Sequence, residues 1–399
     1  MPTMVRGIRT TDLVSSSLIK REVWDAIYNF KPYQTPVMQY LFANKRNKYK
    51  VGNPKVEIQE DVLVPHSDVV TDALTGGATT EADVVVTNIG YFKVGDVIRN
   101  TTANENYRVT AVDTANVEID IKKVGSGNIT ATAANWTALI IGPAFAEGAA
   151  SAQALSTQGT FPYNYTEILK GAVHMSGTQK ATENYGGNDW THQWVKATEE
   201  IKNFIERLSI FGVRHLDSGT AGGYIRHTGG FIDTQTDAMG IQDVSQYIGD
   251  DFCTESYFFK TYCKNLFAKG SNEKVLYCGS DALLAINEFS AVKQQTKVGE
   301  KEYGYDVNLI LTPFGRAKLV WQPFMEGEYS NWVFGVDRDD YLKYFYLSAN
   351  GENRDLHFEE NIGTPGTDED KAQYLAEMGF HLAGSGQGVH RRLYPGASA

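Results

Sequence analysis

A single long amphipathic helix sets the scale of this fold. Apolar side chains recur every three or four residues between Trp194 and Phe211, which places them on one face of a helix. Asn188 is a candidate N-cap before this stretch, and Gly212 is a helix-ending residue after it. We therefore predict a helix over about 190–212. About 22 residues at 1.5 Å each span about 33 Å, long enough to cross a whole domain.

Most of the other strong patterns indicate β-strands. Val56, Ile58 and Val62 alternate with polar residues, which predicts a strand over 55–64 with one apolar face. Short apolar runs separated by Gly and Asn turns fill residues 84–142 and predict a small barrel or sandwich inserted into the main chain. Helices and strands follow one another without strict alternation, so the predicted fold class is α+β.

The N-terminal region combines an apolar helix face with a basic run. Residues 12–30 are predicted to be helical, with Trp24, Ile27 and Tyr28 on one face. A second short helix is predicted to start at Pro36, with Thr35 as its N-cap. The basic run at 45–50 suits either a solvated connector or a contact with an acidic surface of another copy.

Composition excludes several classes of protein. The 399 residues carry 37 Lys and Arg against 48 Asp and Glu, a formal net charge of −11, so the bulk surface does not suit duplex DNA. No apolar run approaches the roughly 20 residues that span a bilayer, and no signal peptide is recognisable, so we expect no membrane partner and a cytoplasm-like compartment. Cys253, Cys263 and Cys278 lack CxxC spacing and are expected to be buried thiols.

The sequence lacks the common patterns of catalytic and metal sites. There is no HExxH, no GxxxxGKS/T and no GxSxG. The acidic stretch at 337–340 does not have EF-hand spacing and is expected to be a solvated loop. We therefore predict no catalytic residue, no cofactor and no metal ion, and thus a protein that is not an enzyme.

One region resembles a known family. It contains LIIGPA at 139–144, EGA at 147–149, NYTEIL at 164–169, MSGTQ at 175–179 and IERL at 205–208 within the long helix. This succession is similar to the major head proteins of tailed bacteriophages, in particular the group resembling the major head protein of phage SU-10. Proteins of that group share the HK-97-like capsid fold.

The resemblance implies a division of the chain. Expected parts are an N-terminal arm, an E-loop region, an inserted β domain, a peripheral domain with a spine helix at about 190–212, and an axial domain. In that order they would occupy residues 1–47, then 48–83 with 143–170, then 84–142, then 171–225 with 346–399, and finally 226–345.

The resemblance also implies a function. It predicts a structural protein that self-assembles, through pentamers and hexamers, into an icosahedral shell around the double-stranded DNA of a tailed phage, without sequence-specific DNA binding. Assembly would occur in the host cytoplasm, and portal, scaffolding or decoration proteins are further partners that the resemblance allows. Residues chosen as subunit-contact candidates are Trp24, Ile27, Tyr28, Val56, Ile58 and Val62.

Two alternatives stay open at this point. An encapsulin-like compartment would use the same fold around a protein cargo. A tail or other virion β-structural protein would explain the strands of 84–142, but not a long helix at 190–212.

Overall fold

The computed structural model divides the chain into two compact units. The first contains residues 1–58 and 162–399, and the second contains residues 59–161. The residues that the structure describes are 35–43, 47–61, 63–149, 154–183, 188–218, 223–234, 247–248, 252–289, 297–302, 305–338, 341–384 and 388–394. The helix expected at 12–30 lies outside these ranges.

One sheet of the larger unit joins distant parts of the chain. Its strand order is β1-β20-β23-β10, and β21 and β22 pair at its side. β1 is parallel to β20, whereas β23 is antiparallel to both β20 and β10. The expected E-loop region thus begins with a strand of this sheet. The strands are β1 Lys48–Val51, β10 Glu167–Ser176, β20 Leu342–Ala349, β21 Glu352–Asn353, β22 His357–Glu359 and β23 Glu369–Leu382.

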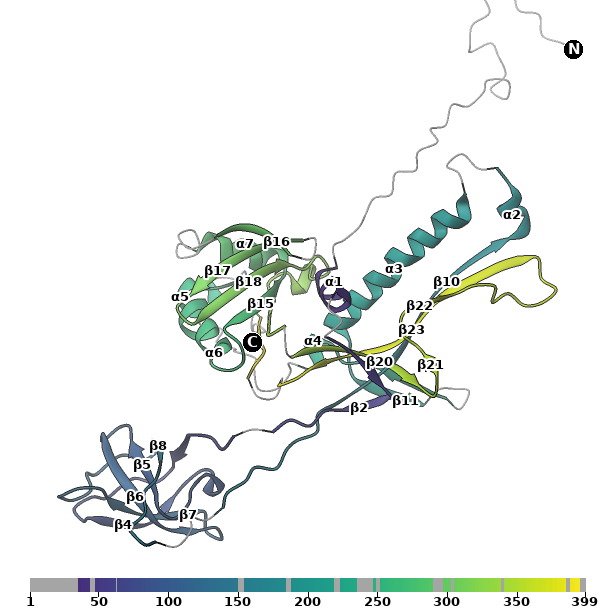
Figure 1. Cartoon of the computed structure of the whole chain (residues 1–399). Coiled ribbons are helices and arrows are strands. Elements are labelled where there is room, and N and C mark those ends of the chain that lie inside the picture. The colour runs from purple at the N-terminus through teal and green to yellow at the C-terminus, as the bar shows by residue number, and fades with distance from the viewer. Residues whose placement is uncertain are drawn as a thin grey trace, which may run out of the picture. The chain divides into compact units, whose positions relative to one another are not determined.

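The long helix is α3, Asp189–Phe211, and it lies along β10 (Figure 1). The side chain of Asn188 caps it by accepting the N–H of Trp190 at 3.1 Å, as the sequence predicts. At its end the N–H of Gly212 donates to the carbonyl of Leu208 at 3.0 Å. A Cβ at Gly212 would lie 2.5 Å from the Thr228 carbonyl oxygen, so close packing requires glycine there.

The predicted short helix is α1, Pro36–Ala43, with Pro36 at its first position. Its apolar residues Val37, Tyr40 and Leu41 are buried in the same core as Ile201 and Ile205 of α3. This core also includes residues of β20 and β23. The start of the described chain is therefore an integral part of the larger unit.

A second sheet and four helical segments form another part of the larger unit. The strand order is β16-β17-β18-β15-β19-β24, in which only β15 and β18 are parallel. Cys253, Cys263 and Cys278 are buried in its core, as expected. The mixed arrangement confirms the α+β class. The elements are α5 Glu255–Tyr257, the π-helical segment Phe258–Cys263, α6 Lys264–Leu266, β15 Glu273–Cys278, α7 Ser280–Glu288, β16 Lys297–Glu302, β17 Tyr305–Thr312, β18 Gly315–Trp321, β19 Val333–Val336 and β24 Arg391–Leu393.

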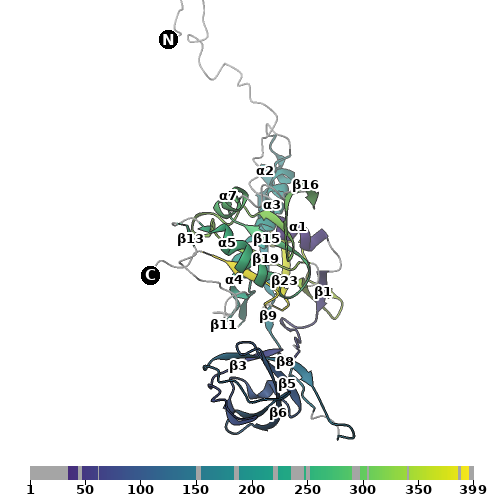
Figure 2. The ribbon, with the colours of Figure 1, turned by 90° about the vertical axis from the view of Figure 1, so that its left-hand side faces the viewer.

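The smaller unit is a closed β-barrel (Figure 2). Its strand order is β3-β8-β5-β6-β7-β4, and a bridge between Val70 and Val86 joins the two ends of the sheet. Trp136 and Tyr107 are fully buried inside it. The barrel extends beyond residues 84–142, the range expected for the inserted β domain, because β3 and the start of β4 belong to it. Its strands are β3 Ser67–Val70, β4 Thr80–Val85, β5 Asp96–Asn100, β6 Glu105–Asp113, β7 Glu118–Lys123 and β8 Trp136–Pro143.

The strand predicted over 55–64 is shorter than expected. It is β2, Lys55–Glu57, which pairs only with β9, Tyr163–Tyr165. Beyond it, an isolated bridge joins Glu60 and Thr160, whose backbone groups exchange hydrogen bonds of 2.9 and 2.8 Å. The remaining short elements are η3 Ile89–Tyr91, α2 Gly177–Ala181, β11 His215–Ser218, β12 Tyr224–His227, α4 Phe231–Thr234, β13 Tyr247–Ile248, β14 Phe252–Cys253 and η6 Gly327–Tyr329.

Candidate functional site

A buried carboxylate fixes the start of the described chain to the long helix. Glu206 of α3 has no exposed surface. Its Oε1 accepts the backbone N–H of Val37 at 3.0 Å, and its Oε2 accepts that of Met38 at 2.7 Å. Gln322 donates its side-chain N–H to Oε1 as well. Because the first N–H groups of a helix have no partner within it, Glu206 caps α1 from a distant part of the chain.

This arrangement replaces the N-cap expected from the sequence. The Thr35 hydroxyl does not accept a helix N–H and instead donates to Met38 Sδ at 3.9 Å. Burial raises the pKa of Glu206 to about 7, although its three hydrogen bonds act in the opposite direction. Glu206 therefore fixes the first turn of α1 to the core.

Two of the candidate contact residues lie at the paired strands β2 and β9: Val56 is in β2, and Ile58 directly follows it. Val56 and Ile58 are half-buried, and the N–H of Ile58 donates to the Pro162 carbonyl at 3.0 Å. Arg214 supports this ribbon by donating to the Tyr163 carbonyl at 2.7 Å and covering the Tyr163 ring at 4.4 Å. The structure thus brings Val56 and Ile58 together on one ribbon. The other four candidates, Trp24, Ile27, Tyr28 and Val62, lie outside the described residues.

A second buried carboxylate organises the region beside this ribbon. Glu377 of β23 is 2% exposed. It accepts hydrogen bonds from Arg226 at 2.8 Å, from Arg354 at 2.6 Å and from Thr166 at 3.1 Å. Two guanidinium groups on one buried carboxylate hold their three elements together, because breaking either pair would leave a charge unpaired. Glu377 is not predicted from the sequence, where its only signal is an acidic residue within the apolar part of β23.

A third buried polar group corrects one expectation. Asp337 and Arg338 are buried, not part of a solvated loop, and the Arg338 guanidinium covers the Tyr40 ring at 4.1 Å. Asp337 accepts the N–H of Ser271 at 2.6 Å. The physical reason is that Asp337 directly follows the buried strand β19 and lies next to Lys274 in a polar interior.

Lys274 is a fully buried base in that interior, and its pKa is altered. Burial lowers its pKa to about 8, while Asp337 opposes the change. Its ammonium group donates to the carbonyls of Leu266, Lys269 and Val389 at 2.7, 2.6 and 2.5 Å. All three protons of the ammonium group are thus engaged. Lys274 joins a helix end to the C-terminal segment, and its amine is not presented to a substrate.

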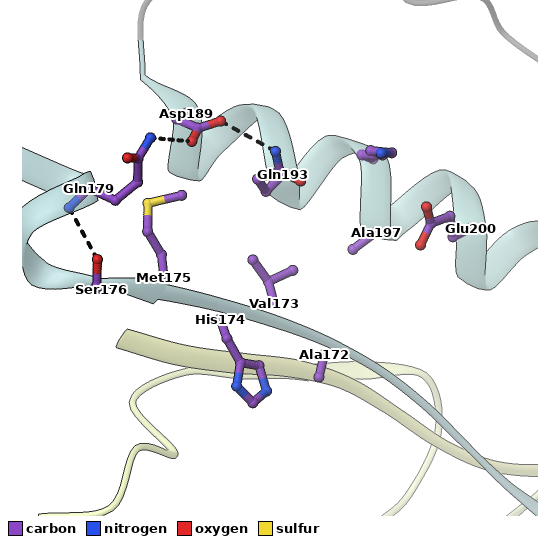
Figure 3. A pocket seen from close by; sticks show the side chains of 11 residues that line it. Ala172, Val173, His174, Met175, Ser176, Gln179, Asp189, Gln193, Ala197 and Glu200 are labelled. Atoms are coloured by element: carbon purple, nitrogen blue, oxygen red, sulfur yellow. Dashed lines mark hydrogen bonds between the residues drawn. The ribbon is translucent and has the colours of Figure 1, made fainter. Parts of the chain in front are cut away.

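A groove of about 490 Å³ lies between β10 and the N-terminal half of α3 (Figure 3). Val173 and Met175 point from the strand toward the helix, whereas His174 points away from it (Figure 3). Ser176 accepts the N–H of Gln179 at 3.3 Å and so caps α2. The groove therefore does not pair its serine with its histidine as a nucleophile and base.

Neither a metal cluster nor a membrane span is found in the described part of the chain. Among the described residues, no three His, Cys, Asp or Glu side chains converge as metal ligands would. None of the described helices is both long and apolar enough to cross a membrane.

Comparisons with known proteins place these features in a family. The sequence matches the family model described as SU10 major capsid protein over residues 7–384. No curated protein matches it. Among solved structures, the capsid of an empty GTA particle is similar with a TM-score of 0.50 at 8% identity, covering 95% of each chain.

Two further capsid structures are similar over nearly the whole chain. The capsid of a native GTA particle gives a TM-score of 0.48 at 9% identity, covering 96% of this chain and 97% of that one. A chain of Mycobacterium phage Adephagia gives 0.46 at 10% identity, covering 98% and 99%.

The fold therefore defines a class, the phage capsid shell proteins with the HK-97-like fold. Because the family model covers nearly all of the sequence, the chain belongs to the SU10 major capsid protein family. It is a structural protein of the virion, and copies of it associate as the capsomers of a shell. The resemblance found in the sequence is confirmed.

Proposed function

We propose that this protein self-assembles into the icosahedral head shell that encloses the double-stranded DNA of a tailed phage. The observation that carries the proposal is the family match over residues 7–384. The formal charge of −11 is consistent with a container that does not bind its DNA tightly. Pentamers and hexamers of the chain would close the shell by repeating the same contacts.

The division into capsid parts is also proposed, with boundaries adjusted to the strands. The ribbon of β2 and β9 is the base of the E-loop, and the barrel within residues 59–161 is the inserted domain. The peripheral domain contains α3 and the sheet of β1, β20, β23 and β10. The axial domain contains the sheet from β16 to β24.

Subunit contacts are proposed at the ribbon and at the N-terminal arm. A two-stranded ribbon gains little stability alone and gains more when it lies on a neighbouring copy. Val56 and Ile58 would contribute to that contact. The contact would be extended by Trp24, Ile27 and Tyr28 of the arm and by Val62 of the E-loop. Trp24 would be the anchor, because buried Trp often dominates interface energy.

The proposed role is structural, without an enzymatic step. The polar clusters at Glu206, Glu377 and Lys274 are each used in internal hydrogen bonds. Portal, scaffolding or decoration proteins are proposed as additional partners in the virion.

Sedimentation of the purified full-length protein, with and without nuclease treatment, tests the proposed function. We expect fast-sedimenting particles from protein alone, and nuclease-resistant DNA only in particles from infected cells. Particles that contain a defined protein cargo and never DNA would favour the encapsulin-like compartment instead. A chain that stays a small oligomer at all concentrations would contradict both.

A further inference from the structure

A hairpin that follows α3 exposes apolar side chains on both of its faces. It consists of β11 and β12, His215–Ser218 and Tyr224–His227. Leu216 and Tyr224 lie on one face and Ile225 on the other, as the cross-strand register requires. Their exposed fractions are 41%, 70% and 52%. A two-stranded hairpin with both faces bare is at best marginally stable in water.

The root of this hairpin is nevertheless firmly held. Arg226 donates to the buried carboxylate of Glu377 at 2.8 Å. The N–H of Thr228 donates to Glu167 Oε2 at 2.9 Å, and Arg214 donates to the Tyr163 carbonyl at 2.7 Å. These contacts fix the orientation of the strands before any partner arrives. Docking therefore costs less conformational entropy, because these strands are already ordered.

The polar groups of the hairpin do not suit a nucleic acid. His215 and Asp217 lie 2.9 Å apart, and His227 lies 3.7 Å from the same carboxylate. The basic side chains at the root, Arg214 and Arg226, are engaged with Tyr163 and Glu377. No row of available cations remains along the described strands to contact phosphates. The hairpin offers apolar area and internally paired charge, which suits a protein surface.

The size of the apolar patch indicates what kind of protein partner the hairpin binds. A few side chains cover much less than the roughly 800 Å² per partner that a stable complex of two proteins buries. Such a contact is useful where many contacts form together, as between the subunits of a shell. We propose that the hairpin of β11 and β12 docks on a second copy of this chain, burying Tyr224 and Ile225. This inference rests on the proposed function, because only the assembled shell supplies that copy.

Thiol labelling tests the contact directly. The three native cysteines are buried, so a cysteine introduced at the hairpin is the accessible thiol of the folded protein. We would compare maleimide labelling of Tyr224→Cys in unassembled subunits and in shells formed from purified protein without DNA. We expect labelling to be at least about tenfold slower in the shells. Ala115→Cys, in an exposed turn of the barrel, is the control for general slowing by the shell.

Each outcome decides the inference. Shells in which Tyr224→Cys reacts as fast as in subunits, or is slowed no more than Ala115→Cys, would overturn the hairpin contact and leave the proposed function intact. The same result at Ile225→Cys would contradict the contact a second time.

If no variant and no wild-type protein forms shells, the proposed function fails, and the inference fails with it. Protection that occurs only in DNA-filled particles would assign the hairpin to DNA and overturn the inference. A Tyr224→Cys subunit that melts like wild type yet cannot assemble, while Ala115→Cys assembles, would support it.

Discussion

Glu206 Oε2 accepts the backbone N–H of Met38 at 2.7 Å, so the C-terminal part of the long helix α3 caps the first described helix of the chain. The carboxylate has no exposed surface, and it accepts two hydrogen bonds from α1 and one from Gln322. Such a group costs desolvation energy and is kept only where its partners are fixed. Glu206 therefore fixes the first turn of α1 to α3.

The first prediction concerns pH. The folded-state pKa of Glu206, about 7, lies above its ordinary value of 4.5. Between these values the folded protein holds a proton that the unfolded chain has released. The free energy of unfolding should therefore fall by on the order of 3 kcal/mol as pH rises from about 5 to about 7. Above pH 7 it should change little. Denaturant unfolding at several pH values measures this.

The matched variant for that experiment is Glu206→Gln. Its amide keeps an acceptor for α1 but cannot ionise, so the downward slope between pH 5 and 7 should disappear. Glu206→Ala should instead lose about 2–4 kcal/mol throughout, because the N–H groups of Val37 and Met38 lose their acceptor. A Gln variant with the wild-type slope would show that another group titrates.

The second prediction concerns the buried face of α3. Ile205 is 0% exposed, whereas its neighbour Phe204 is 43% exposed. Ile205→Asp should be insoluble or lose more than about 4 kcal/mol, because it buries an unpaired carboxylate. Phe204→Asp, the control, should stay soluble and lose at most about 1 kcal/mol. Similar solubility and melting of both variants would mean that the buried face is assigned wrongly.

The third prediction concerns the barrel. Ile58 and Pro162 are joined by a 3.0 Å hydrogen bond, so a short Gly/Ser linker can replace residues 59–161. The shortened chain should still melt cooperatively by circular dichroism. Replacing only 84–142 should fail, because it leaves β3 without its partner β8. If the shorter replacement folds and the longer one does not, the barrel boundary is wrong.

The fourth prediction concerns the N-terminal arm. Deleting residues 1–31 should leave a soluble, cooperatively melting subunit that no longer forms closed particles, because the deletion removes Trp24 and keeps α1. Deleting residues 1–43 removes α1, exposes Glu206 and should impair folding as well. Particle counts and thermal melts separate the two effects. Normal shells from the first truncation would remove the arm from the assembly mechanism.

The sequence predicts elements whose signal is local. The long helix, its Asn188 cap and its Gly212 end follow from periodicity and capping chemistry over a short window. The α+β class and the buried cysteines follow from similarly local patterns. The resemblance carried by residues 139–212 predicts the capsid family, which the match over residues 7–384 confirms.

Contacts across long distances in the chain escape such reasoning. The parallel pairing of Lys48 with Tyr344 has no local signature, because register between distant strands is set by the whole sheet. The only sign of the Glu206 cap in the sequence is an acidic residue next to Ile205 near the apolar face of the predicted helix. The sequence places the start of the barrel too late, at residue 84. The Gly- and Thr-rich stretch at 74–80 interrupts the alternation of apolar and polar residues just before β4.

Cryo-electron microscopy of the purified full-length protein tests the central claim most directly. The account predicts closed icosahedral shells whose repeating subunit contains the long helix α3 beside β10 and the barrel of residues 59–161. Open tubes, or discrete small oligomers with no closed particles at any protein concentration, would contradict it.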